Sequence, residues 1–167
     1  MKKLNRIFLL LVATSFFVSC NNDDNGSNDA PLGKYDNGFF VVNEGNSNQS
    51  TASITFVSDA GLVEGNVFGA VNPTSPGTGT YLQSMFFDDT RAFIISGNAN
   101  KVTIVNRYTF EFIASVDTNF ANPRYGAVVN GKAYITNYAD YATGADDFFT
   151  VIDLTNYSTS KVALNNW

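Results

Sequence analysis

The stretch Lys-Ala-Tyr-Ile-Thr-Asn at residues 132–137 has two counterparts earlier in the chain. They are Arg-Ala-Phe-Ile-Ile-Ser at 91–96 and Gly-Phe-Phe-Val-Val-Asn at 38–43. Each is followed by a polar loop and then by further short apolar runs, separated by clusters of Gly, Asn and Asp. Such runs are typical of β-strands, and no stretch sustains a helical apolar period. The sequence therefore predicts an all-β protein built from repeated units.

Further segments continue each unit in the same order. Second strands are expected at 52–57, 101–105 and 148–154, and third strands at 62–71, 110–116 and 160–164. Two more segments, at 81–87 and 124–129, open the second and third units. Four strands in roughly 40–45 residues are typical of a β-propeller blade, although a β-sandwich or a solenoid also has regular short strands. We predict a β-propeller of four-stranded antiparallel blades near 38–71, 81–116 and 124–164.

The last unit resembles a known repeat. Ala133-Tyr134-Ile135-Thr136-Asn137, followed by Val151-Ile152-Asp153-Leu154, resembles the YVTN-type (YncE-like) β-propeller repeat. In that family an aromatic-Val-Thr-Asn strand precedes a strand ending in Val-Ile-Asp. Residues 93–96 with 102–106 are a looser copy, and 41–46 resemble the first blade of Bacteroidota surface lipoproteins of this kind. The resemblance is more specific for a fold than for a ligand.

The expected strands are too few for a closed ring. The segments above amount to eleven strands, fewer than three full blades, and the first unit lacks an innermost strand. Propellers typically have 4–8 blades, and relatives with the YVTN repeat usually supply the missing strand from their C-terminus. We therefore expect residues 35–167 to be a partial propeller, from the N-terminal part of a longer, seven-bladed protein.

Residues 1–19 are expected to be a lipoprotein signal peptide. A start with three cations precedes an apolar run at 7–18, which is shorter than the roughly 20 residues that a membrane span needs. The run ends in Phe17-Val18-Ser19-Cys20, which resembles the bacterial lipobox, with Phe where Leu is usual. The resemblance implies cleavage before Cys20 and attachment of acyl chains to it. A buried or free Cys after an ordinary secretory signal is the alternative.

Residues 20–34 are expected to be a flexible tether. The stretch 21–29 has no apolar residue, so it cannot bury surface against a core. Acidic residues just behind Cys20 resemble the surface-export signal of Bacteroidota lipoproteins. That resemblance implies a domain on the outer membrane, facing the cell exterior. A spacer that faces the periplasm is the alternative.

Composition excludes several kinds of chemistry. The chain has no His and one Cys, which excludes His-based catalytic triads, His-ligated zinc, Cys-rich metal sites and intrachain disulfides. Its net charge of −5 argues against nucleic-acid binding, which needs clustered Lys and Arg. No phosphate-binding loop, serine-centred motif or lysine-based nucleophile pair is visible. The sequence thus favours a non-catalytic protein over an enzyme.

The long loops are expected to lie together on one side of the predicted propeller, where binding residues often occur. They are at 43–51, 72–80, 98–100, 119–123 and 138–147. Their side chains can stack on a planar ligand and hydrogen-bond a polar one. The expected ligand-binding residues are Asn43, Glu44, Arg124, Tyr125, Asn137, Tyr138, Asp140 and Tyr141. Alternatively, these loops are tolerated insertions, and Tyr125 and Tyr138 fill gaps between blades.

The last of these loops also offers oxygen ligands for calcium. Asp140, Thr143, Asp146 and Asp147 carry carboxylate and hydroxyl oxygens, which Ca²⁺ prefers. Their spacing matches no calcium-loop motif, so a solvated acidic loop is the preferred interpretation, with no cofactor.

The functional hypothesis that we favour is a surface lipoprotein that captures a nutrient or small ligand for an outer-membrane transporter. The resemblance implies cobalamin as one such ligand and a TonB-dependent receptor as the partner, because some similar surface propellers bind cobalamin beside such receptors. One alternative is a calcium-dependent, lactonase-like hydrolase that uses Glu44 or Asp140. Another is a structural or adhesion protein of the cell surface.

Overall fold

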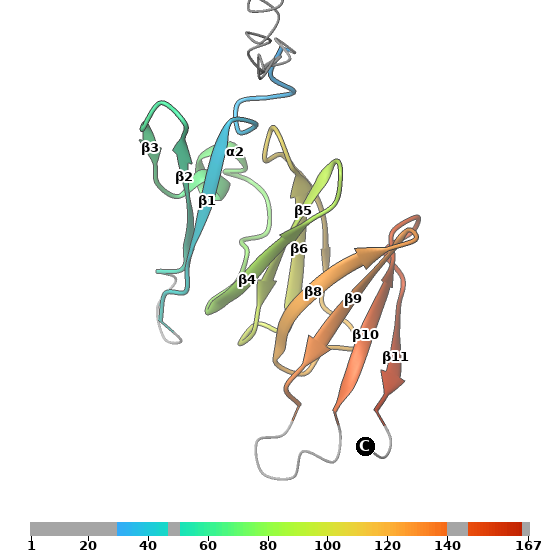
Figure 1. Ribbon diagram of the computed structural model, residues 1–167. Helices are drawn as coiled ribbons and strands as arrows, with labels where there is room; N and C mark the ends of the chain where they lie inside the picture. Colours follow the sequence, from blue (N-terminus) through green and yellow to red (C-terminus); the bar gives the residue numbers. More distant parts are fainter. Residues whose placement is uncertain (1–29, 47–50, 140–146, 165–167) are drawn as a thin grey trace, which may run out of the picture. The chain divides into compact units, whose positions relative to one another are not determined.

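The computed structural model describes residues 30–46, 51–139 and 147–164. All of these except Ala30 belong to one compact unit. They form three antiparallel sheets and one short helix (Figure 1), so the predicted all-β class is confirmed. No helix in these ranges is long and apolar enough to cross a membrane.

The three sheets follow one another along the chain, and neighbours in the sequence are neighbours in each sheet. The first sheet contains β1 (Gly38–Asn43), β2 (Ser53–Ser58) and β3 (Val63–Glu64). The second contains β4 (Leu82–Phe87), β5 (Arg91–Ser96), β6 (Lys101–Asn106) and β7 (Phe112–Val116). The third contains β8 (Pro123–Val129), β9 (Lys132–Asn137), β10 (Phe148–Asp153) and β11 (Thr159–Ala163).

The three matching stretches of sequence occupy matching places in the sheets. They form β1, β5 and β9, and each pairs antiparallel with the strand that follows it. β4 and β8 pair with the other edge of β5 and β9. No strand in the described ranges pairs with the other edge of β1. Within these ranges the first sheet therefore has no counterpart of β4 and β8.

One predicted strand is wrong. Instead of a strand over 62–71, the chain forms the two-residue β3 and then the helix α2 (Val67–Val71). The chain turns at Asn66, whose backbone is left-handed with φ 50°. Val67 and Phe68 then reach the core from the helix. Apolar residues suited to a strand form a helical turn here because burial outweighs their weak intrinsic preference.

Two apolar clusters hold the sheets together. Ile94 and Phe110 of the second sheet are buried against the first sheet, whereas Phe93 and Ile95 are buried against the third. Neighbouring residues of β5 alternate between the two clusters, because successive side chains of a strand point to opposite faces. The second sheet is therefore covered on both faces. We call the face of a sheet that points away from the preceding sheet in the chain its front face.

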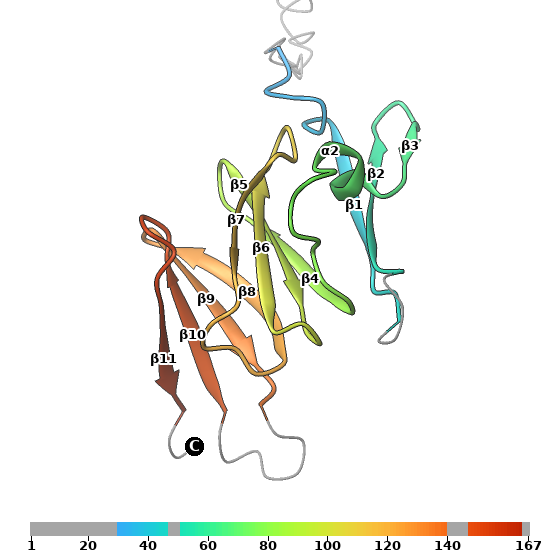
Figure 2. The same cartoon turned by 180° about the vertical axis from the view of Figure 1, so that it is seen from behind.

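The connections lie at two opposite ends of the sheets (Figures 1 and 2). The β4–β5 and β8–β9 hairpins and the β6–β7 and β10–β11 turns form the short-loop end. The ends of β1, β5 and β9 and the starts of β2, β6 and β10 form the long-loop end. Asn130 and Gly131, between β8 and β9, have φ of 49° and 73°. These values are those of a type I′ hairpin turn, which an Asn-Gly pair predicts.

Candidate functional site

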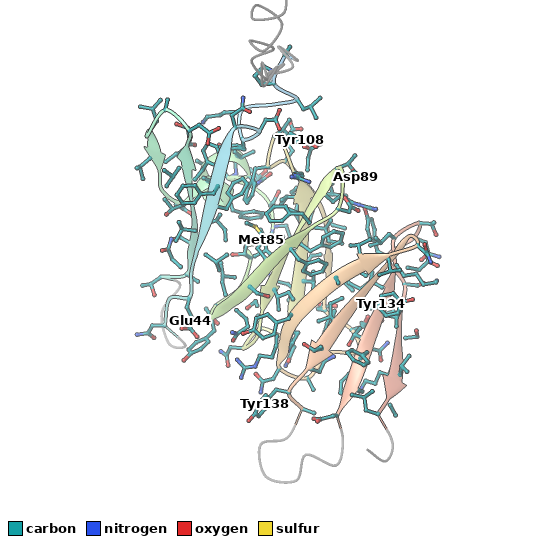
Figure 3. The ribbon with its side chains drawn as sticks, in the orientation of Figure 1. Glu44, Met85, Asp89, Tyr108, Tyr134 and Tyr138 are labelled. Carbon is teal, nitrogen blue, oxygen red and sulfur yellow. The ribbon has the colours of Figure 1, made fainter. Side chains whose placement is uncertain are left out.

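Residues from all three sheets lie beside one another at the long-loop end, next to the starts of β4 and β8. The Leu82 N–H donates to the Glu44 carbonyl oxygen at 3.0 Å, which places the end of β1 beside the start of β4. The Ser84 hydroxyl donates to the Arg124 carbonyl oxygen at 2.6 Å, which joins β4 to β8. Figure 3 shows Glu44 and Tyr138 at this end of the molecule.

The Arg124 side chain is at the centre of this group. Its Nη1 donates to Gln83 Oε1, and its guanidinium carbon lies 5.2 Å from the centre of the Tyr138 ring. That distance is typical of a cation–π contact. The Tyr138 N–H donates to the Asn122 carbonyl oxygen at 3.0 Å, which fixes the backbone below the ring. We call Gln83, Arg124 and Tyr138 the Arg124 cluster.

The Arg124 cluster can recognise a ligand through three kinds of contact. The Tyr138 side chain is 46% exposed, so part of its ring is open to stacking. The planar guanidinium carries N–H donors in a fixed fork, and the Gln83 amide offers both donors and acceptors. Glu44 is exposed, and its backbone carbonyl oxygen, bonded to Leu82, places it beside the start of β4. These features suit a ligand with a planar part and polar substituents.

Asn43 and Asn137, two of the predicted binding residues, have internal partners. Asn137 is 7% exposed; its Nδ2 donates to Thr150 Oγ1 at 2.9 Å, and its Oδ1 accepts from the Ala121 N–H at 3.0 Å. Asn43 Nδ2 donates to Thr55 Oγ1 at 3.0 Å in the same way. Both amides form hydrogen bonds within the protein at the ends of their strands, so we leave them out of the candidate site.

Tyr125 lies apart from the Arg124 cluster. Tyr125 follows Arg124 in the stretch between Pro123 and Gly126 where the pairing of β8 with β9 shifts register. It is 62% exposed, and its backbone exchanges hydrogen bonds with the Thr136 hydroxyl at 3.2 and 3.3 Å. The structure therefore separates two aromatic residues that the sequence placed in one site.

The other predicted site residues lie outside the described residues. These are Cys20, Asp140 and Tyr141, together with Thr143 and Asp146 of the calcium hypothesis. Asp147 is described and exposed. In the described ranges no group of three or more His, Cys, Asp or Glu side chains is placed to hold a metal ion.

Gln83 is a member of the cluster that the sequence did not indicate. It is one amide within the apolar segment 81–87, and nothing in the spacing marks it as functional. Its position beside Arg124 follows only from the pairing of β4 with β5 and from the contact between β4 and β8. A single polar residue near the start of an inner strand is the only available signal.

Comparisons with known proteins identify no family. No family model matches the chain, and no curated protein matches it. Among solved structures, the chain is similar to the crystal structure of a protein described as exported, from Bacteroides fragilis, with a TM-score of 0.49 and 17% sequence identity. The similarity covers 76% of this chain and 37% of that protein. The chain thus spans well under half the length of that structure.

Proposed function

We propose that the protein is a surface lipoprotein that captures a small ligand at the long-loop end without converting it chemically. In this proposal Cys20 carries the lipid anchor in the outer membrane, and a TonB-dependent transporter receives the ligand. The observation that carries the capturing role is the Arg124 cluster. It combines an open aromatic ring with a guanidinium and an amide, and it draws them from two sheets.

The rigid surroundings of the cluster support binding. Gln83 and Arg124 stand on strands paired within four-stranded sheets, and the Tyr138 backbone is held by Asn122. Side chains fixed before the ligand arrives lose little conformational freedom on binding, and this favours affinity. The chemistry of the cluster also suits capture, because its members offer contacts and no nucleophile with an adjacent base.

The proposal includes a propeller fold in which a further sheet covers the third one. Phe93 is fully buried on the front face of the second sheet, whereas Tyr134 at the matching place of the third sheet is 39% exposed. Val129 is exposed on the same front face at 53%. An apolar sheet face of this kind favours contact with another sheet over contact with water.

Ligand titration tests the capturing role. Cyanocobalamin is the first probe, because it has a planar ring system with polar substituents. We expect saturable binding that Tyr138→Ala weakens roughly tenfold, since a stacked aromatic contact contributes about 0.5–1.5 kcal/mol beyond its buried area. Tyr125→Ala removes a neighbouring exposed tyrosine outside the cluster and should leave the affinity unchanged. Equal weakening by both variants would remove the Arg124 cluster as the binding site.

Metabolic labelling tests the anchor. Cells expressing the full chain should incorporate radioactive palmitate into the protein, and Cys20→Ser should abolish the label. Protease added to intact cells should degrade the wild-type protein if it faces the exterior. Label that persists in Cys20→Ser would contradict the anchoring proposal.

A further inference from the structure

A second site lies between the first and second sheets. A cavity of about 410 Å³ is bounded by the start of β2, by α2, by residues 77–80 and by Lys101 at the start of β6. Figure 2 shows the segment that leads from α2 to β4 between the two sheets. The volume falls within the roughly 300–1,000 Å³ of small-molecule sites. The cavity shares no lining residue with the Arg124 cluster.

The wall formed by residues 77–80 is held in place against the second sheet. Gly79 has a φ of 98°, and a Cβ at this position would come within 2.7 Å of both Ser96 Oγ and the Ala99 side chain. The Ser96 hydroxyl donates to the Thr80 carbonyl oxygen, and Thr78 is buried. Only glycine allows this close approach with a left-handed backbone. The backbone of residues 77–80 therefore fixes this wall of the cavity.

Lys101 is the one charged residue among the described residues that line the cavity. Its Nζ donates to the Gly77 carbonyl oxygen, which occupies one of the three N–H donors of an ammonium group. Lys101 has no ion-pair partner within the described ranges. Burial lowers the pKa of Lys101, and the charge of Asp117 opposes this shift only in part. Lys101 is thus partly buried, and among the described residues it has no counter-charge within ion-pair distance.

The remaining lining is mixed. Phe68 of α2 supplies apolar surface, whereas Ser53, Thr78 and Thr80 are hydroxyl-bearing residues. A partly desolvated cation attracts an anion strongly, because a charged hydrogen bond is about twice as strong as a neutral one. We propose that this cavity binds a small organic anion, whose carboxylate or sulfate group pairs with Lys101 and whose apolar part lies against Phe68. This site is independent of the proposed capture at the Arg124 cluster.

Two matched probes test the proposal on the full chain. Phenylacetate carries an aromatic ring and a carboxylate, and phenylacetamide has the same shape without the charge. We expect phenylacetate to bind saturably and phenylacetamide to bind at least tenfold more weakly, because the amide lacks the charge-assisted pairing. Lys101→Met should weaken phenylacetate binding by a similar factor. Lys161→Met, which removes an exposed cation outside the cavity, should leave the affinity within twofold.

A measurement on the unaltered chain covers the case in which Lys101→Met fails to fold. The rate at which Lys101 is acetylated, followed by mass spectrometry of its peptide, should fall when phenylacetate is bound, while the rate at Lys161 stays constant. Equal affinity for the acid and the amide would overturn the proposal. So would an unchanged acetylation rate of Lys101 at saturating phenylacetate, or phenylacetate binding by Lys101→Met as tight as by the wild type.

Discussion

Replacement of Phe93 and of Tyr134 by alanine tests how the sheets stack. The two residues occupy the same place in β5 and β9, and both point to the front face of their sheet. Phe93 is fully buried, and its ring is stacked on that of Phe86 with centres 4.7 Å apart and planes 8° from parallel. Truncation of a buried Phe costs about 3–5 kcal/mol of unfolding free energy, of which the lost aromatic pair is a part. Tyr134 is 39% exposed, so its truncation should cost about 1 kcal/mol.

Urea unfolding of the chain, followed by fluorescence and circular dichroism, measures the two losses. We expect Phe93→Ala to lower the unfolding free energy by at least about 2 kcal/mol more than Tyr134→Ala does. Because domains of this size have only about 5–15 kcal/mol of stability, Phe93→Leu provides a milder variant that stays folded. Equal losses for Phe93→Ala and Tyr134→Ala would refute the assignment of Phe93 to a buried contact between the second and third sheets.

Two further predictions concern polar groups. Thr103 and Thr150 occupy matching, fully buried places, but Thr150 Oγ1 has Asn137 and Asn119 as partners, whereas Thr103 Oγ1 has none among the described residues. In urea unfolding, Thr150→Val should therefore destabilise the chain by about 1–3 kcal/mol, and Thr103→Val should stabilise it by about 1 kcal/mol; the opposite order would contradict this account. Burial opposes the ionisation of Asp88, but hydrogen bonds from Arg91 and Thr90 outweigh it and hold the pKa of Asp88 below its ordinary value of 3.8. This stabilisation is complete above pH 4 and disappears as the pH falls through the folded pKa, so Asp88→Asn should flatten the acid limb of a stability–pH curve; a limb as steep as that of the wild type would contradict this role.

Periodicity was sufficient to predict most strands but not the segment after β2. β1, β5 and β9 repeat an aromatic and β-branched pattern, and their turn residues mark where each strand ends. Residues 62–71 have the same apolar character, yet they divide into β3 and α2. The difference depends on the space left between the first and second sheets, which Val67 and Phe68 fill. Local sequence carries no information about that space.

The candidate site was predicted in part, because the sequence does not say which of two adjacent polar residues faces inward. Arg124 and Tyr138 lie together as expected, whereas Tyr125 is 62% exposed and its backbone bonds to the Thr136 hydroxyl. Asn137 has a side chain long enough to reach Thr150, whereas Ser96 at the matching place bonds to Thr80 and leaves Thr103 without a hydrogen-bond partner among the described residues. These differences follow from strand pairing and from side-chain length, so they appear only in three dimensions.

The most direct test of the proposed function uses the tyrosines of the unaltered chain as reporters. Tyr125, Tyr134 and Tyr138 are all exposed, at 62%, 39% and 46%, and only Tyr138 belongs to the Arg124 cluster. Iodination with and without saturating cyanocobalamin, followed by mass spectrometry, measures the protection of each ring. The account predicts that the ligand slows iodination of Tyr138 and leaves Tyr125 and Tyr134 unchanged. Protection of Tyr125 or Tyr134 with Tyr138 still reactive would contradict it.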